Sequence, residues 1–177
     1  MSFQQAIACS TFPQETKVDH VTIEEMSTPV VCQGIAYWNS LRGARPFPAR
    51  DDIRVRDIAG LLKHMVLAKV LEGGNDFLLK IVGDEVCRSY RAPIINRRFS
   101  EIAADLPHTV QRWQALYRRV VLTGIPIAVV VTVGLEVPEI NFTHAETVCL
   151  PFGPEGQLPD HIVTFGQHTA RPGILRL

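Results

Sequence analysis

A tight turn between two apolar segments is the feature of this sequence that most limits its possible folds. The segments Met65–Leu71 and Phe77–Val82 are rich in residues that favour β-strands, and residues 72–76 between them contain the pair Gly73-Gly74 followed by Asn and Asp. Such a turn between two apolar runs is a strong signal for a β-hairpin. The sequence therefore predicts an antiparallel pair of strands over residues 65–82.

The segments on either side of this hairpin predict a mixed α+β fold. Before it, apolar side chains recur every third or fourth residue, as in an amphipathic helix that ends near Gly43; these are Val31, Ile35, Trp38 and Leu41. Short helices are expected near residues 57–62, 84–90 and 100–104. A long helix is expected over residues 107–122, since Pro107 suits its first turn and Gly124 its end. Three strands then follow, at Ile127–Val133, Ile140–Leu150 and His161–Gln167.

The short connections between these last three strands require antiparallel neighbours. Together with the hairpin they predict a five-stranded antiparallel sheet with helices on one face. The strand Ile127–Val133 is apolar at almost every position, whereas a strand with one wet face would alternate. We therefore expect the amphipathic helix Val31–Arg42 to cover the second face of the sheet.

Composition excludes several classes of protein. Lys and Arg balance Asp and Glu at 18 each, without the basic excess typical of a nucleic-acid-binding protein. The longest apolar run, Ile125–Val133, is about half of the ~18 residues that span a bilayer, so no membrane span is expected. The cysteines at positions 9, 32, 87 and 149 form no C-x-x-C pair and indicate reduced thiols in a cytoplasmic protein.

The length of 177 residues suits one domain with extensions. Residues 1–20 are polar and aperiodic and are predicted to be a flexible N-terminal arm. Residues 21–50 contain the first helix and an extended connector with Pro46 and Pro48. Residues 51–170 are predicted to form the domain itself, and residues 171–177 a C-terminal tail.

Two motifs carry a resemblance to a known family. The first is Trp38-x-x-Leu41-Arg42-Gly43 with Arg45 and Pro48 behind it, and the second is Glu146 with Leu150-Pro151. In this respect the chain resembles a bacterial family of single-domain PAS-like proteins, over roughly residues 35–168. The family often has glycines in the segment that is 90–97 here. This chain has none there, and Asn96 is expected to adopt the left-handed backbone instead.

The resemblance implies a PAS-like fold and a non-enzymatic sensory or adaptor module in signal transduction. It implies as a ligand a small apolar or amphipathic molecule, or else a signalling protein partner. In many PAS proteins an N-terminal helix also packs against a second subunit, so the resemblance implies a homodimer. We expect its interface to include the apolar side chains of the first helix, which are Val31, Ile35, Trp38 and Leu41.

Alternation along Ile140–Leu150 predicts the polar residues of a ligand pocket. The even positions are the more apolar set, so His144 and Glu146 are expected on the inner face, between sheet and long helix. They would then contact a ligand or Tyr90, Arg112 or Tyr117; alternatively, Glu146 is a structural carboxylate that binds backbone groups or an arginine. Trp113 and Tyr117 are four residues apart on the long helix, either in the core or against a ligand. The predicted ligand-binding set is Tyr90, Trp113, Tyr117, His144 and Glu146.

Cofactor and catalytic motifs are weak or missing. Cys87-Arg88-Ser89-Tyr90 lacks the flanking residues of a covalent flavin motif, and His108 or His144 alone is little support for haem. The histidines show no metal-ligand spacing, so no metal site is expected and the cofactor stays unknown. No G-x-S-x-G motif is present. The competing hypothesis is a small cone-shaped α+β enzyme that uses a buried His144–Glu146 pair as general base.

Overall fold

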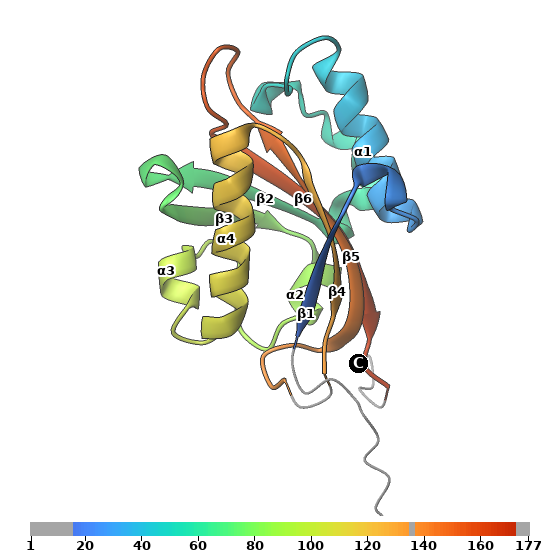
Figure 1. The fold of residues 1–177 in the computed structure, drawn as a ribbon, viewed down its shortest axis with the longest axis vertical. Helices are drawn as coiled ribbons and strands as arrows, with labels where there is room; N and C mark the ends of the chain where they lie inside the picture. Colours follow the sequence, from blue (N-terminus) through green and yellow to red (C-terminus); the bar gives the residue numbers. More distant parts are fainter. Residues whose placement is uncertain (1–15, 135–136, 173–177) are drawn as a thin grey trace, which may run out of the picture.

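A computed structural model describes residues 16–134 and 137–172, and one antiparallel sheet organises them (Figure 1). The strand order across the sheet is β1-β4-β5-β6-β2-β3, and each neighbouring pair is antiparallel. The strands are β1 (Lys17–Val21), β2 (Met65–Leu71), β3 (Asp76–Val82), β4 (Ile127–Thr132), β5 (Phe142–Phe152) and β6 (His161–Ala170). The predicted α+β class with one antiparallel sheet and helices is confirmed.

The sheet has six strands, and the prediction of five was wrong. The additional strand β1 falls mostly in the segment predicted to be a flexible arm, of which residues 1–15 lie outside the described residues. It pairs along the free edge of β4, from Lys17 opposite Thr132 to Val21 opposite Ala128. A free edge leaves a row of backbone groups unpaired, and this pairing satisfies them. Val18 and Val21 then pack against opposite faces of the sheet.

Helices and short 3-10 segments fill the connections. The α-helices are α1 (Pro29–Arg42), α2 (Asp84–Arg88), α3 (Phe99–Ile102) and α4 (Pro107–Thr123). The 3-10 segments are η1 (Ile23–Glu25), η2 (Arg50–Asp52), η3 (Val55–His64) and η4 (Glu72–Gly74). The hairpin β2–β3 lies within one residue of its predicted bounds, and its strand β2 pairs with β6 inside the sheet. Asn96 has a φ of 56°, the left-handed backbone expected in place of a glycine.

Both faces of the sheet are covered, each by its own apolar core. Helix α4, with α3 and α2, packs on one face, and α1 with η3 packs on the other (Figure 1). This arrangement explains why β4 is apolar at successive positions. Val129 points into the α4 core and Ala128 into the α1 core. The expectation that the N-terminal helix covers the second face is confirmed.

Close contacts fix α1 to the sheet of its own chain. Trp38 is 3% exposed and its Nε1 donates a hydrogen bond to the Pro151 carbonyl at 2.9 Å. Gly34 lies directly against the Phe165 ring, where a Cβ atom would clash. Val31 is fully buried in the same core. Val31 and Trp38 are therefore too buried to contact a second subunit, contrary to the interface predicted for them. The homodimer itself stays a prediction.

Ile35 and Leu41 are half-buried at the side of α1. Of the predicted tail, only Arg171 and Pro172 belong to the described residues, and the Arg171 guanidinium donates hydrogen bonds to the carbonyls of Gly134 and Val137. Across the described ranges, no helix combines the length and apolar character needed to cross a bilayer.

Candidate functional site

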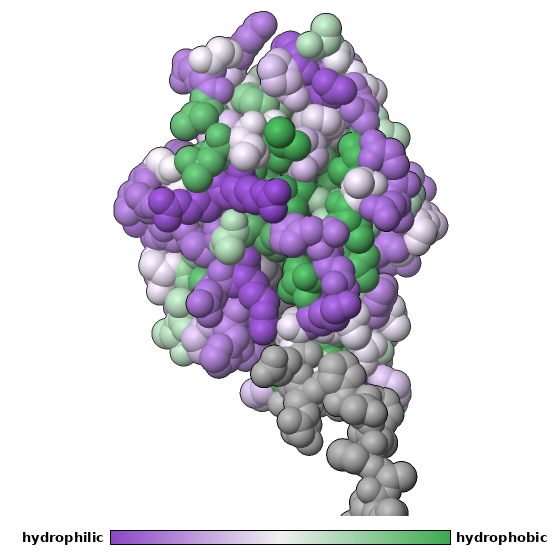
Figure 2. All heavy atoms as spheres, in the orientation of Figure 1, coloured by the Kyte–Doolittle hydropathy of each residue, from purple (hydrophilic) through white to green (hydrophobic). Residues whose placement is uncertain are grey.

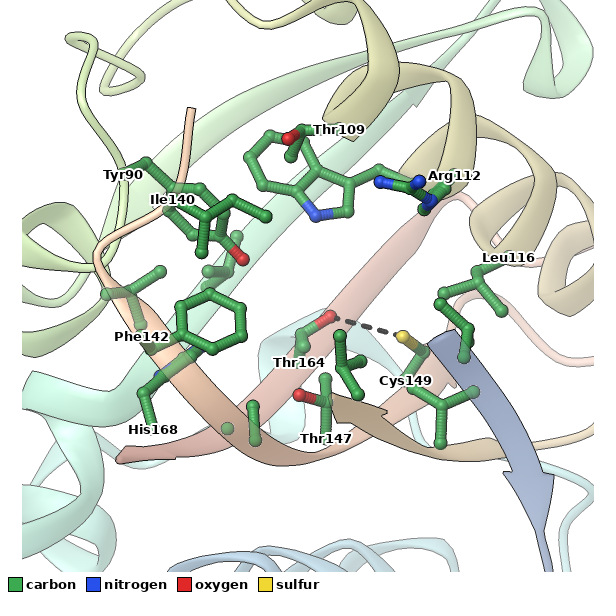
Figure 3. A pocket seen from close by; sticks show the side chains of 18 of the residues that line it. Tyr90, Thr109, Arg112, Leu116, Ile140, Phe142, Thr147, Cys149, Thr164 and His168 are labelled. Carbon is green, nitrogen blue, oxygen red and sulfur yellow. Dashed lines mark hydrogen bonds between the residues drawn. The ribbon is translucent and has the colours of Figure 1, made fainter. Parts of the chain in front are cut away.

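A cavity of about 90 Å³ lies between the sheet and helix α4 (Figure 3). Strands β4, β5 and β6 form its floor, and α4 together with the segment around Tyr90 forms its roof. Most of the lining is apolar, with Val129, Val131 and Ala145 on the sheet and Leu116 on α4 among its members. A mostly apolar space with a few polar groups at fixed positions has the chemical character of a small-molecule site.

Aromatic rings form one wall of the cavity. The ring of Tyr90 meets that of Trp113 edge to face, with centroids 4.8 Å apart, and that of Phe142 at 5.9 Å. Phe99 packs between Trp113 and Tyr117, at 5.5 Å and 5.3 Å. Such tilted and edge-to-face pairs hold each ring in place. The wall is therefore preformed and apolar.

One hydrogen-bonded chain crosses from the helix to the sheet. The hydroxyls of Tyr117 and Thr164 are 2.7 Å apart, and Thr164 donates to Cys149 Sγ at 3.7 Å. Burial raises the pKa of the Cys149 thiol to about 12 and raises the pKa of Tyr117 as well. Both groups are therefore protonated at neutral pH. Cys149 is not a thiolate nucleophile in this environment.

Three polar atoms at the cavity have no hydrogen-bond partner within the part of the chain that the structure describes. They are Thr16 Oγ1, His64 Nδ1 and His168 Nδ1, and each of these atoms is buried while its residue lines the cavity. Burial, and then the nearby His64, lower the pKa of His168 to about 4. Burial and then Lys63 lower the pKa of His64. Neutral imidazoles with an unused ring nitrogen can each donate or accept one hydrogen bond, according to tautomer.

Arg112 supplies the charge at this site. It lines the cavity from α4, is half-buried, and makes no hydrogen bond or ion pair with any described residue. Thr109, one turn before it, is already bonded through its N–H and hydroxyl to Glu139 Oε2, at 3.1 and 2.7 Å. Among the described residues that line the cavity there is no Asp or Glu. Arg112 is therefore a positive side chain at the cavity that has no ion-pair partner among the described residues.

The molecular surface is hollowed beside α4. Figure 2 shows apolar surface in a depression between α4 and β1, bordered by hydrophilic side chains. Val18 of β1 and Leu116 of α4 line the cavity from these two elements and are both half-buried. A small molecule can approach the cavity on this side.

The structure brings together three of the five predicted ligand-binding residues. Tyr90, Trp113 and Tyr117 line the cavity, whereas His144 and Glu146 lie outside it. His144 is exposed, and Glu146 lies on the α1 side of β5. The predicted inner face of this strand was therefore wrong, and the structure contains no buried His144–Glu146 pair that could act as general base.

The error has a physical cause in β5. The strand is covered on both sides, so apolar residues occupy both of its faces: Val148 and Leu150 pack toward α1, and Cys149 packs toward α4. A register shift between Phe142 and His144 also breaks the alternation. Alternation identifies the inner face only when the other face is wet.

Glu146 instead binds the start of α1. Its carboxylate accepts hydrogen bonds from the N–H and hydroxyl groups of Ser27 and Thr28, at 2.6–3.0 Å. Burial alone would raise the pKa of Glu146, but the hydrogen bonds from Ser27 and Thr28 outweigh it and lower the pKa to about 2. This is the structural carboxylate that the sequence left open as an alternative, bound to backbone N–H groups and hydroxyls of the two residues that precede α1.

Sequence reasoning missed Thr16, His64 and His168 and considered Arg112 only as a partner of the His–Glu pair. None of them belongs to a motif, and their common surroundings come from segments that are far apart in the sequence. Metal chemistry finds little support in this set, because the described residues contain no group of three or more His, Cys, Asp or Glu that could hold an ion. Cys32, Cys87 and Cys149 are free thiols, and Cys9 lies outside the described residues.

Comparison with known proteins gives one match. A family model described as PAS domain matches residues 26–165, which is well over half of the chain and contains α1, α4 and all strands but β1 and the end of β6. The curated proteins contain no match to the chain, and neither do the solved structures.

Proposed function

The chain belongs to the PAS domain family, and from this premise we propose that it is a non-enzymatic sensor or adaptor that binds a small molecule between the sheet and α4. The ligand is apolar or amphipathic, since most of the cavity lining is apolar. Occupation of the cavity alters the contacts that the chain makes with a signalling partner. Its scattered free thiols favour a reducing compartment, which we infer to be the cytoplasm.

The observation that carries this proposal is the set of unpaired polar atoms in an apolar cavity. Native proteins rarely leave a buried polar atom without a partner, because each one costs about 1–3 kcal/mol. Three such atoms, on Thr16, His64 and His168, are brought to one cavity. A ligand with matching donors and acceptors would satisfy them and gain affinity from it.

Catalysis has less support than binding. PAS domains typically act as non-enzymatic sensory modules, and the residues of the competing hypothesis are not together: His144 is exposed and Glu146 is bonded to α1. Cys149 faces the cavity as a protonated thiol. These features favour a ligand that is bound and released unchanged.

Native mass spectrometry of the protein purified from its own host tests the proposal directly. We expect a mass above that of the chain, and loss of the extra mass on denaturation. The variant Thr147→Phe places a ring at the cavity wall and should abolish the adduct. Thr169→Phe makes the same change at an exposed site on β6 and should retain it. An unliganded mass for the wild type, or an adduct that survives Thr147→Phe, would contradict binding in this cavity.

A further inference from the structure

We propose that the ligand is a small organic acid, with its carboxylate at Arg112 and its apolar body against the aromatic wall of the cavity. This inference rests on the proposed function and specifies the ligand class for the same site. It follows from charge, from size and from the positions of the remaining polar atoms.

Charge is the first argument. Arg45, Arg88 and Arg97 each form an ion pair with a neighbouring carboxylate at 2.7–2.8 Å. Arg112 has no such partner in the described part of the chain, although it is half-buried beside an apolar space without a lining carboxylate. A guanidinium in such surroundings favours a planar anion that it can bind through two parallel hydrogen bonds. A carboxylate has this geometry.

Size is the second argument. The volume of the cavity is about 90 Å³. A single water molecule needs about 10–15 Å³ of cavity volume. The cavity therefore has room for roughly six to nine non-hydrogen atoms. Benzoate and hexanoate fall in this range, whereas a flavin, a haem or a long-chain fatty acid is far larger.

The distribution of polar groups is the third argument. Arg112 projects from α4, whereas His168 lies beside Phe142 on the sheet, at the other end of the cavity (Figure 3). Between them lie the apolar wall and the rings of Tyr90 and Trp113. A ligand aligned by its carboxylate at Arg112 directs its opposite end toward His168. A hydroxyl or carbonyl group at that end would pair with the unused Nδ1 of His168.

Matched probes test the acid specificity. Isothermal titration calorimetry with benzoate and benzamide, and with hexanoate and hexanamide, compares molecules of equal size that differ in charge. We expect each acid to bind the wild type on the order of tenfold or more tightly than its amide. Arg112→Gln should remove this preference, because it weakens the binding of each acid far more than that of its amide. Arg112→Lys should restore part of it, because the charge returns without the planar fork.

Arg118→Gln is the control, since it neutralises an exposed arginine on the same helix that does not line the cavity. It should bind the acids as the wild type does, and circular dichroism should show all three variants folded. Equal affinity for acids and amides, or a preference that survives Arg112→Gln, would overturn the acid assignment while the cavity still bound small molecules. Failure of all four probes would overturn it too, and the native mass spectrum would then decide the proposed function separately.

Discussion

Glu146 and Thr28 are 118 residues apart in the chain, yet the Glu146 carboxylate accepts hydrogen bonds from both the N–H and the hydroxyl of Thr28, at 2.9 and 3.0 Å. Thr28 immediately precedes α1, where a helix presents unpaired N–H groups and the positive end of its dipole. A carboxylate at this point satisfies the N–H groups and complements the dipole. The middle strand β5 thus holds the first turn of the outer helix.

The Glu146 contact predicts a loss of stability in acid. The folded-state pKa of about 2 lies below the ordinary value of 4.5, so the carboxylate contributes its full stabilisation above pH 4.5 and loses it as the pH falls toward 2. We expect this contribution to be on the order of 3 kcal/mol. Glu146→Gln should lower the unfolding free energy at pH 7 and flatten its pH dependence below 4.5, as measured by urea denaturation. If the unfolding free energy of the variant fell below pH 4.5 as it does in the wild type, the Glu146 carboxylate would contribute no stability through its contact with α1.

His168 predicts a second pH effect in a different range. Its folded-state pKa of about 4 lies below the ordinary 6.5, so the unfolded state takes up a proton first and stability falls as the pH drops from 6.5 toward 4. His168→Phe keeps an aromatic ring beside Phe142 and removes the titrating group. It should raise the melting temperature more at pH 5 than at pH 8. The same change at exposed His144 is the control, and equal effects of His168→Phe at both pH values would refute the prediction.

The burial of Trp38 and its hydrogen bond to Pro151 predict that the chain needs α1 in order to fold. Trp38→Phe leaves the Pro151 carbonyl without its donor and should cost about 1–3 kcal/mol of unfolding free energy. Trp38→Glu places an unpaired charge in the core and should unfold the chain, with loss of far-UV circular dichroism. Ala36→Glu, at an exposed position of the same helix, should leave the spectrum intact. A folded Trp38→Glu protein would mean that α1 is dispensable.

Gly34 predicts a steric limit on the packing of α1. A Cβ at this position would clash with Cδ2 of the Phe165 ring, so Gly34→Ala forces the helix away from the sheet. We expect a loss of about 1–3 kcal/mol in the unfolding free energy, despite the better helix propensity of Ala. Gly60→Ala, where a Cβ meets no atom within 4 Å, should be close to neutral.

A double-mutant cycle separates this clash from other effects of the substitution. Phe165→Leu removes part of the ring, so the double variant Gly34→Ala/Phe165→Leu should be more stable than the sum of the single changes implies. Additive losses would place the cost of Gly34→Ala somewhere other than at Phe165.

Local signals made most of the fold predictable. The turn at Gly73-Gly74, the helix-compatible Pro107 and the closing Gly124 predicted β2, β3 and α4 to within about one residue of their bounds. The strand β1 escaped prediction because its sequence, Lys-Val-Asp-His-Val, has no apolar alternation and no neighbouring turn to mark it. It is a strand because β4 offers it a free edge, and that edge lies more than a hundred residues away.

The site was less predictable than the fold, because it too depends on contacts between segments that are far apart in the sequence. The aromatic residues Tyr90, Trp113 and Tyr117 could be predicted, because large apolar side chains on one helix face or beside a strand end turn inward. His64 and His168 could not, because each is a single polar residue whose burial depends on elements distant in sequence. Because both faces of β5 are covered and carry apolar residues, its sequence likewise did not show which face turns toward the cavity.

Neighbouring residues of β5 belong to opposite sides of the molecule. Thr147 lines the cavity, while Glu146, the residue before it, holds the first turn of α1. One peptide unit therefore separates a residue of the cavity wall from a carboxylate that accepts hydrogen bonds of 2.6–3.0 Å from Ser27 and Thr28. Strand β5 is thus a shared wall, with the cavity on one side of the sheet and the attachment point of α1 on the other.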